Sequence, residues 1–218
     1  MALFRTTKDR KAREAGIDPA RIPPGQYYTD KWPVLHAGSI PKVDLATWDL
    51  NVFGLVKNPV RLSFDELKEL GERDQISDIH CVTRWTRLDM PWKGVPLRTI
   101  LDLVEPLDSA RYVIAHAEQG YTANLPIEAL RDEGVLLAYE AEGAPLTPEH
   151  GYPLRLLVPS RYFWKSAKFV RGLELMAGDR PGFWEDNGYH NDGDPWREER
   201  HSVDLYTARG LGRSARDR

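Results

Sequence analysis

The apolar residues of this chain fall into short segments, and turn-forming residues separate one segment from the next. Alternation of apolar and polar residues predicts a strand, whereas apolar residues three and four positions apart predict a helix. Strands are expected over 48–56, 77–83, 111–118, 135–143, 152–159 and 169–177, and short helices over 63–70, 97–104 and 126–133. Because these elements follow one another without a regular strand–helix–strand rhythm, the pattern predicts an α+β fold.

Charge is distributed unevenly over the 218 residues, whose net charge is −3. Residues 1–24 and residues 207–218 each carry a net charge of +3, which leaves −9 on residues 25–206. An acidic body does not suit a nucleic-acid-binding protein, whose affinity comes mostly from neutralised phosphates. The basic ends hold few large apolar residues and are expected to be solvated. We therefore expect a basic N-terminal tail over 1–20, a single domain over 21–206 and a basic tail over 207–218.

The sequence also bears on the compartment. No window approaches the roughly 18 apolar residues of a membrane-spanning helix, and the N-terminus lacks the apolar core of a secretory signal. A single cysteine excludes an internal disulfide and every CxxC metal site. These features predict a cytoplasmic protein without membrane insertion.

The cysteine, Cys81, lies at the end of an expected strand, between His80 and a segment with two arginines, Arg84 and Arg87. Nearby positive charge would favour the thiolate. A thiolate serves as a nucleophile or as a soft metal ligand, whereas a buried cysteine is often inert. A nucleophile also needs a histidine base, and the sequence does not show which of the six histidines approaches Cys81.

A second cluster has cationic residues. Arg155 lies inside an apolar strand segment, where a charge is costly unless it meets an anion or a carboxylate. Lys165 and Lys168 follow on either side of Ser166, and they offer charge and donors for a phosphate. No P-loop motif is present. A phosphate site and a structural ion pair both remain open at this point.

Two irregular segments are rich in aromatic residues. Residues 21–44 include four prolines together with Tyr27, Tyr28 and Trp32, and a loop of that composition is expected to press against the body. Residues 182–196 combine aromatic side chains with glycines, so they are expected to form an ordered loop that covers a site or packs on the core.

Taken together, the sequence resembles the molybdopterin-binding domain of the sulfite oxidase family, in particular its stand-alone bacterial members. The resemblance covers about residues 21–200 and rests on five motifs in order: PPGQ (23–26), HCVTRW (80–85), HGYPLRLLVP (150–159), WKSAK (164–168) and GFWEDNGYH (182–190). It implies the sulfite-oxidase-type fold of mixed sheets with short helices. It also implies one molybdenum ion held by a single molybdopterin, a pyranopterin dithiolene.

The resemblance implies a role for each matching residue. Cys81 is the expected metal ligand, and the expected cofactor-binding residues are His80, His150, Arg155, Ser166, Ala167 and Lys168. Tyr189 is expected to line the substrate pocket. Sulfite oxidases place an arginine beside the metal where this chain has Asp30 and Lys31, so Arg84 or Arg87 is the candidate to replace it, and Arg84 is the expected catalytic residue.

The implied activity is two-electron oxygen-atom transfer on a small substrate of the sulfite, S-oxide or N-oxide class. Without a heme motif or a nicotinamide fingerprint, the chain is expected to exchange electrons with an external one-electron carrier. The immunoglobulin-like domain of sulfite oxidases and the twin-arginine signal of the related reductases are missing from the sequence. Two alternatives stay open: a molybdopterin carrier without turnover, and a cysteine hydrolase that uses Cys81.

Overall fold

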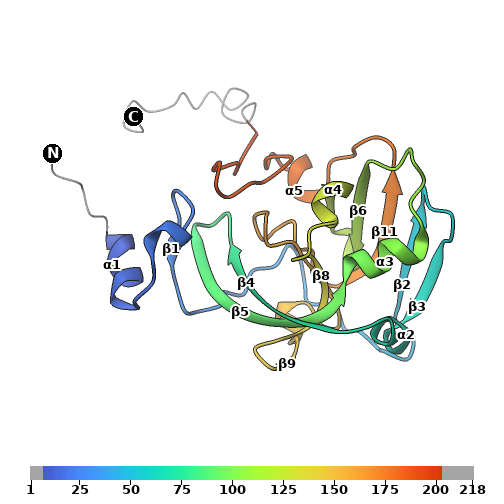
Figure 1. The fold of residues 1–218 in the computed structure, drawn as a ribbon, viewed down its shortest axis with the longest axis horizontal. Helices are drawn as coiled ribbons and strands as arrows, with labels where there is room; N and C mark the ends of the chain where they lie inside the picture. Colours follow the sequence, from blue (N-terminus) through green and yellow to red (C-terminus); the bar gives the residue numbers. More distant parts are fainter. Residues whose placement is uncertain (1–6, 203–218) are drawn as a thin grey trace.

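Two mixed β-sheets and five short α-helices make up residues 7–202, the part of the chain that the computed structural model describes (Figure 1). Sheet A has the strand order β1-β5-β8-β10, with β4 paired to β5 and β9 to β8. Its strands are β1 (Tyr27–Tyr28), β4 (Arg73–His80), β5 (Trp85–Pro96), β8 (Leu136–Ala141), β9 (Ala144–Pro145) and β10 (Arg155–Leu157). The α+β prediction is confirmed.

Sheet B has the order β3-β2-β11-β6-β7. Its strands are β2 (Asp49–Gly54), β3 (Val60–Ser63), β6 (Tyr112–Ala117), β7 (Thr122–Pro126) and β11 (Val170–Met176). Two strand pairs are parallel, β1 with β5 and β2 with β11, and the other pairs are antiparallel. The alternation predicted from the sequence is present, because Leu50 and Val52 of β2 and Trp48 just before it are buried.

The helices are α1 (Thr7–Glu14), α2 (Phe64–Glu69), α3 (Leu97–Val104), α4 (Ile127–Leu130) and α5 (Phe183–Asp186), with 3-10 turns at Pro19–Arg21, Glu118–Gly120 and Pro148–His150. A capping box begins α2: Ser63 Oγ accepts from Glu66 N, and the Glu66 carboxylate accepts from Ser63 N. The buried residues of α3 follow helical spacing, and Glu105 ends the helix in the left-handed region (φ 48°). No described helix is both long enough and apolar enough to cross a bilayer.

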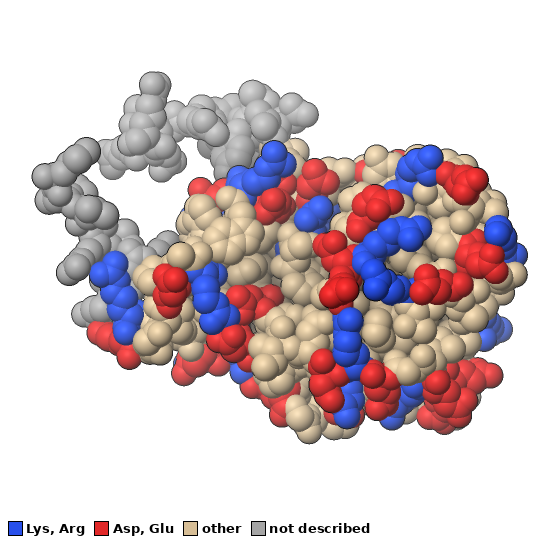
Figure 2. All heavy atoms as spheres, in the orientation of Figure 1, with Lys and Arg blue, Asp and Glu red and all other residues tan. Residues whose placement is uncertain are grey.

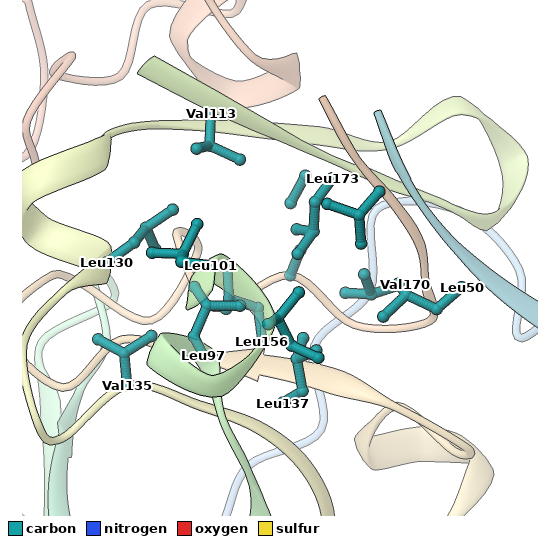
Figure 3. Packing of buried hydrophobic residues seen from close by; sticks show 14 of the residues in the cluster. Leu50, Leu97, Leu101, Val113, Leu130, Val135, Leu137, Leu156, Val170 and Leu173 are labelled. Carbon is teal, nitrogen blue, oxygen red and sulfur yellow. The ribbon is translucent and has the colours of Figure 1, made fainter. Parts of the chain in front are cut away.

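The main core lies between the sheets and takes residues from both (Figure 3). Leu50, Val170 and Leu173 come from sheet B, and Leu137 and Leu156 come from sheet A. Helix α3 adds its apolar face. A second, smaller cluster surrounds Cys81. Sheet A therefore contributes to both clusters, and β10 reaches from the main core to the cysteine.

Two of the differences between the structure and the sequence predictions lie at α1 and at β5. Residues 7–14 were expected to belong to a solvated tail, but they form α1, which contacts β1 and buries Ala12. The segment contains good helix formers such as Lys11, Ala12 and Arg13, which favour a helix. The buried Ala12 then packs this helix against the rest of the protein. The predicted tail at 207–218 lies outside the described residues.

The second difference is β5, which the sequence did not predict although it is the longest described strand. Pro91 and Gly94 lie inside it and are poor strand residues by propensity. Here Gly94 is required, because a Cβ at this position would collide with the Leu137 carbonyl of the neighbouring strand β8. The backbones of β5 and β8 approach closely where the register between them shifts at Lys93 and Gly94, and this contact outweighs the low strand propensity of glycine.

Candidate functional site

A cavity of about 300 Å³ lies where five segments distant in the sequence meet. These are the loop over 32–39, the turn after β4, the turn over 118–121 between β6 and β7, the connection from β10 to β11, and the aromatic segment, defined as residues 182–196. All of them except the turn over 118–121 were singled out in the sequence. Six of the lining residues matter most for the chemistry: Trp32, His36, Cys81, Arg155, Lys168 and Tyr189.

Cys81 begins a tight turn over residues 81–85, here named the Cys81 turn, which connects β4 to β5. Cys81 N donates to Trp85 O at 2.9 Å, and Arg84 N donates to Cys81 O at 2.9 Å. Arg84 takes a left-handed conformation (φ 80°) to complete the turn. The turn leaves Cys81 6% exposed at the cavity wall, where its Sγ accepts a hydrogen bond from Thr83 Oγ1 at 3.1 Å.

The charges near the thiol differ from those predicted. Burial raises the pKa of Cys81, while the Thr83 hydrogen bond and the positive charges of Arg200 and Lys168 act in the opposite direction. Arg84 is exposed and does not line the cavity, because the left-handed residue completes the turn at the surface. Arg87 pairs with Glu142. The expectation that Arg84 and Arg87 activate Cys81 is therefore wrong.

Arg155 is the most unusual charge in the site, because it is 1% exposed and has no ion pair with any carboxylate of the described residues. Its guanidinium donates to His150 O and to Ser166 O, both at 2.9 Å, and its carbon lies 4.1 Å from the Phe163 ring centroid. The Nε atom is buried without a hydrogen-bond partner. Burial lowers the pKa of Arg155 to about 9. Of the two alternatives left open by the sequence, the anion is favoured over the carboxylate.

Lys168 adds a second cation to the same wall. Its Nζ donates to Leu35 O at 2.7 Å and to Glu149 O at 2.6 Å, and it lies 3.5 Å from His36 Nδ1. Burial, followed by the charge of Arg155, lowers the pKa of Lys168 to about 7. The other nitrogen of His36, Nε2, is buried without a partner. When Lys168 is charged its ammonium only donates, so Nδ1 of neutral His36 then accepts and Nε2 carries the hydrogen.

Lys165, the other lysine of the motif, lies elsewhere. Its side chain is fully buried, and Nζ donates to Asn124 O and Oδ1 and forms an ion pair with Glu185 Oε1 at 2.7 Å. The same Glu185 atom accepts from Trp164 Nε1 at 2.7 Å. The hypothesis that both lysines face a phosphate is wrong for Lys165, which instead attaches α5 to the body.

Four further predicted residues lie around the cavity. Ser166 and Ala167 line it, but the Ser166 hydroxyl accepts from Val158 N, and the Ala167 carbonyl accepts from Leu156 N. His150 lies just outside the lining, where its ring stacks on Trp32 with 3.7 Å between centroids. His80 also lies outside the lining, and its Nδ1 is 2.9 Å from Thr86 Oγ1. Burial lowers the pKa of His80 to about 4, so its ring is neutral.

Tyr189 lines the cavity and comes from the aromatic segment. Its ring stacks on Trp184 at 4.7 Å and meets Trp164 edge-on at 5.0 Å. Burial raises the pKa of Tyr189, and the nearby Cys81 charge adds to this effect. The hydroxyl therefore stays protonated at neutral pH and can donate a hydrogen bond.

Sequence reasoning missed four residues of the site: Gln26, His36, Thr83 and Arg200. Gln26 belongs to the PPGQ motif, and its side chain donates to Cys81 O at 2.9 Å. Thr83 belongs to the HCVTRW motif, two residues after Cys81, whereas His36 carries no local signal beyond its residue type, because chain folding alone brings it to the cavity. Asp30 and Lys31, expected near the metal, do not line the cavity.

Comparison with known proteins agrees with this geometry. Residues 37–184 match the family model described as the oxidoreductase molybdopterin binding domain. The chain belongs to this family, the molybdopterin oxidoreductases of the sulfite oxidase type. Membership confirms the predicted family, its fold and the prediction of an oxidoreductase.

One relative has about the length of this chain and another is longer. The chain is 47% identical over 198 residues to the uncharacterized oxidoreductase YuiH of Bacillus subtilis, and the aligned region covers 90% of this chain and 98% of YuiH. It is 32% identical over 176 residues to the protein-methionine-sulfoxide reductase catalytic subunit MsrP of Ralstonia nicotianae, covering 73% of this chain and 52% of MsrP. The chain thus spans about half of that reductase.

Among solved structures, the sulfane dehydrogenase SoxCD of Paracoccus pantotrophus has the same fold, with a TM-score of 0.58 and 24% identity. The match covers 64% of this chain and 40% of the SoxCD chain.

The residues of the cavity fit the cofactor that the family implies. Cys81 offers a soft thiolate ligand, and Arg155 offers a buried positive charge that no described carboxylate neutralises. The buried, unpartnered Nε of Arg155 and Nε2 of His36 are donors available to an anionic group. Among the described residues, no three His, Cys, Asp or Glu side chains converge to hold a metal without further ligands.

Proposed function

We propose that the protein is a molybdenum oxidoreductase that binds one molybdopterin in this cavity, with Cys81 as the protein ligand of the metal. Its reaction would be oxygen-atom transfer on a small substrate of the sulfite, S-oxide or N-oxide class. A single observation carries the proposal: the sulfur of Cys81 and the carboxylate-free Arg155 line the same cavity.

In this proposal Arg155 and Lys168 hold the phosphate of the cofactor. The carbonyls of His150 and Ser166 fix the guanidinium plane, so Arg155 is oriented before any ligand arrives. Lys168 would exchange one of its two backbone carbonyl partners for a phosphate oxygen. His36 Nε2 is a further donor on the same wall.

When bound, the cofactor would supply a metal that exchanges two electrons and one oxygen atom with the substrate. The chain itself contributes the surroundings. Trp32, Trp164 and Trp184 line the cavity and limit the entry of water. The protonated hydroxyl of Tyr189 can donate to the oxygen of an S-oxide or N-oxide, and it orients that oxygen near Cys81.

Electrons would come from, or pass to, an external one-electron carrier. Similarity to MsrP supports this, since its name describes a catalytic subunit of a methionine-sulfoxide reductase. The same similarity supports the S-oxide class among the three candidates. Location in the cytoplasm stays a prediction from the sequence, and fractionation of the native host is its test.

Activity assays on protein from a molybdenum-replete host test the proposal. We expect oxidation of a reduced viologen dye with dimethyl sulfoxide, methionine sulfoxide or trimethylamine N-oxide, or reduction of ferricyanide with sulfite. Cys81→Ser should abolish turnover while the protein stays folded. Protein from a host that cannot synthesise molybdopterin is the matched control and should be inactive.

Two outcomes would point to the alternatives. Bound pterin without turnover, unaffected by Cys81→Ser, would indicate a carrier. Hydrolysis by metal-free protein that alkylation of Cys81 abolishes would indicate a cysteine hydrolase. The structure does not favour the hydrolase, since Cys81 Sγ accepts a hydrogen bond from Thr83 and no hydrogen bond from a histidine of the described residues to it is observed.

A further inference from the structure

Arg200, near the end of the described chain, makes buried contacts that have no role in the proposed function. It is 8% exposed, and its guanidinium donates to Val82 O at 2.8 Å, to Gln26 Oε1 at 3.1 Å and to Pro24 O at 3.3 Å. The guanidinium carbon lies 4.9 Å from the Tyr162 ring centroid. A buried arginine with this many partners has a single orientation.

Gln26 extends this network to both ends of the Cys81 turn. Its Nε2 donates to Cys81 O at 2.9 Å and to Trp85 O at 3.3 Å, while its Oε1 accepts from Arg200. The turn therefore has side-chain support from the N-terminal motif and from the C-terminal segment. Gly25 has a left-handed backbone (φ 70°), which favours glycine, and a Cβ at this position would lie 3.0 Å from Arg200 Nη2.

The backbone of Arg200 reaches the other side of the cavity. His190 N donates to Arg200 O at 3.3 Å, and Tyr189 forms a β-bridge with His201. Tyr189 and Cys81 both line the cavity. One residue thus connects the turn that holds the thiol to the segment that holds the tyrosine.

Both Arg200 and Gln26 lie outside residues 37–184, the part that matches the family model. Resting on the proposed role of Cys81, we propose that Arg200 is a positioning residue that acts through Gln26. It would fix the Cys81 turn relative to Tyr189, and so fix the thiolate ligand relative to the bound substrate.

Hydrogen exchange in the purified full-length protein tests this proposal. In Arg200→Gln we expect exchange at least tenfold faster in peptides covering 80–86 and 188–191. Arg197→Gln is the matched control, because Arg197 lies on the same segment but is exposed and pairs with Glu199; its exchange in both peptides should equal that of the wild type. Arg200→Lys should restore part of the protection.

Gln26→Glu keeps the shape of the side chain and its contact with Arg200 but removes both donors to the turn. In this variant we expect faster exchange than in the wild type at 80–86 and wild-type exchange at 188–191. This variant also decides the question if Arg200→Gln does not fold. Unchanged exchange at 80–86 in both variants, or equal acceleration in Arg197→Gln, would overturn the proposal.

The loaded enzyme gives a second readout. Arg200→Gln should shift or weaken the visible absorption of the metal–thiolate bond and lower kcat at least tenfold, with KM changed less than threefold. An unaltered absorption band together with an unaltered kcat would contradict the positioning role. Absence of molybdenum from the wild type would instead contradict the proposed function, while the exchange experiment would still decide the role of Arg200 in the turn.

Discussion

At the scale of single residues, Arg155 carries the strongest electrostatic argument of the molecule. A buried guanidinium without a carboxylate is costly, because aromatic faces and two carbonyls replace water only in part. Burial lowers its pKa to about 9, which still leaves it charged at neutral pH. An anion in the cavity would offset this cost, and the cofactor phosphate is such an anion.

Replacing Arg155 with Gln should therefore weaken cofactor binding. A hydrogen bond to a charged group contributes about 1.5–3 kcal/mol, so affinity should fall roughly 10-fold to 150-fold. The measurement is the ratio of pterin to protein after purification and after reconstitution. Arg161→Gln is the control, since Arg161 hydrogen-bonds only its neighbour Ser160 among the described contacts. Equal occupancy in both variants would refute the phosphate role of Arg155.

The lowered pKa of Lys168 predicts that cofactor binding depends on pH. A pKa of about 7 means that Lys168 is mostly neutral above pH 7, whereas a phosphate needs its charged form. Binding of the cofactor should thus take up a proton, and affinity should fall as pH rises from 7 to 9. Lys168→Arg keeps the charge and should remove most of this dependence. A wild-type affinity that rises over this range would contradict the assignment.

At the scale of elements, the aromatic segment depends on one buried ion pair. Glu185, 3% exposed at its side chain, accepts from both Lys165 and Trp164, and it attaches α5 to the connection between β10 and β11. Breaking such a pair leaves an uncompensated buried charge. Tyr189 follows four residues after Glu185, so the position of the tyrosine depends on this attachment.

Glu185→Ala should lower the free energy of unfolding by about 3–5 kcal/mol, measured by urea denaturation. Replacing both partners, as in Lys165→Met with Glu185→Leu, should restore part of the loss because no lone charge remains buried. Glu128→Ala is the control, since Glu128 is exposed and pairs only with Arg131. A double variant less stable than Glu185→Ala would show that the pair itself contributes more than its desolvation costs.

Several elements could be predicted because local physics determines them. Helix α3 occupies the predicted range of 97–104, and Ser63 caps α2, since apolar spacing and capping are properties of neighbouring residues. Strand β5 could not be predicted, because Gly94 is required by a contact with the backbone of Leu137 in β8, which lies 43 residues further along the chain. Lys165 was misassigned for the same reason: its partner, Glu185, lies in a distant segment.

At the scale of the whole molecule, the cavity joins parts of the chain that separate on unfolding. Its walls come from the loop at 32–39, the Cys81 turn, the turn at 118–121, the β10–β11 connection and the aromatic segment. On the face drawn in Figure 2, acidic and basic side chains are interspersed over the body.

A bound cofactor should therefore stabilise the entire fold. At a free cofactor concentration about 1,000 times Kd, mass action contributes about 4 kcal/mol. For a chain of this size this corresponds to a rise in Tm of roughly 8–16 °C. Differential scanning calorimetry of loaded and cofactor-free protein measures the difference. An equal Tm for the two forms would contradict binding in a cavity shared by five segments.

The central claim is that this cavity holds molybdenum and one pterin. Its most direct test is elemental analysis by plasma mass spectrometry, together with fluorescence of the oxidised pterin released from the same sample. Protein purified from a host that makes molybdopterin should contain close to one molybdenum and one pterin per chain. Zinc, or no metal, with no pterin would contradict the account and return Cys81 to the role of a nucleophile or of a buried structural thiol.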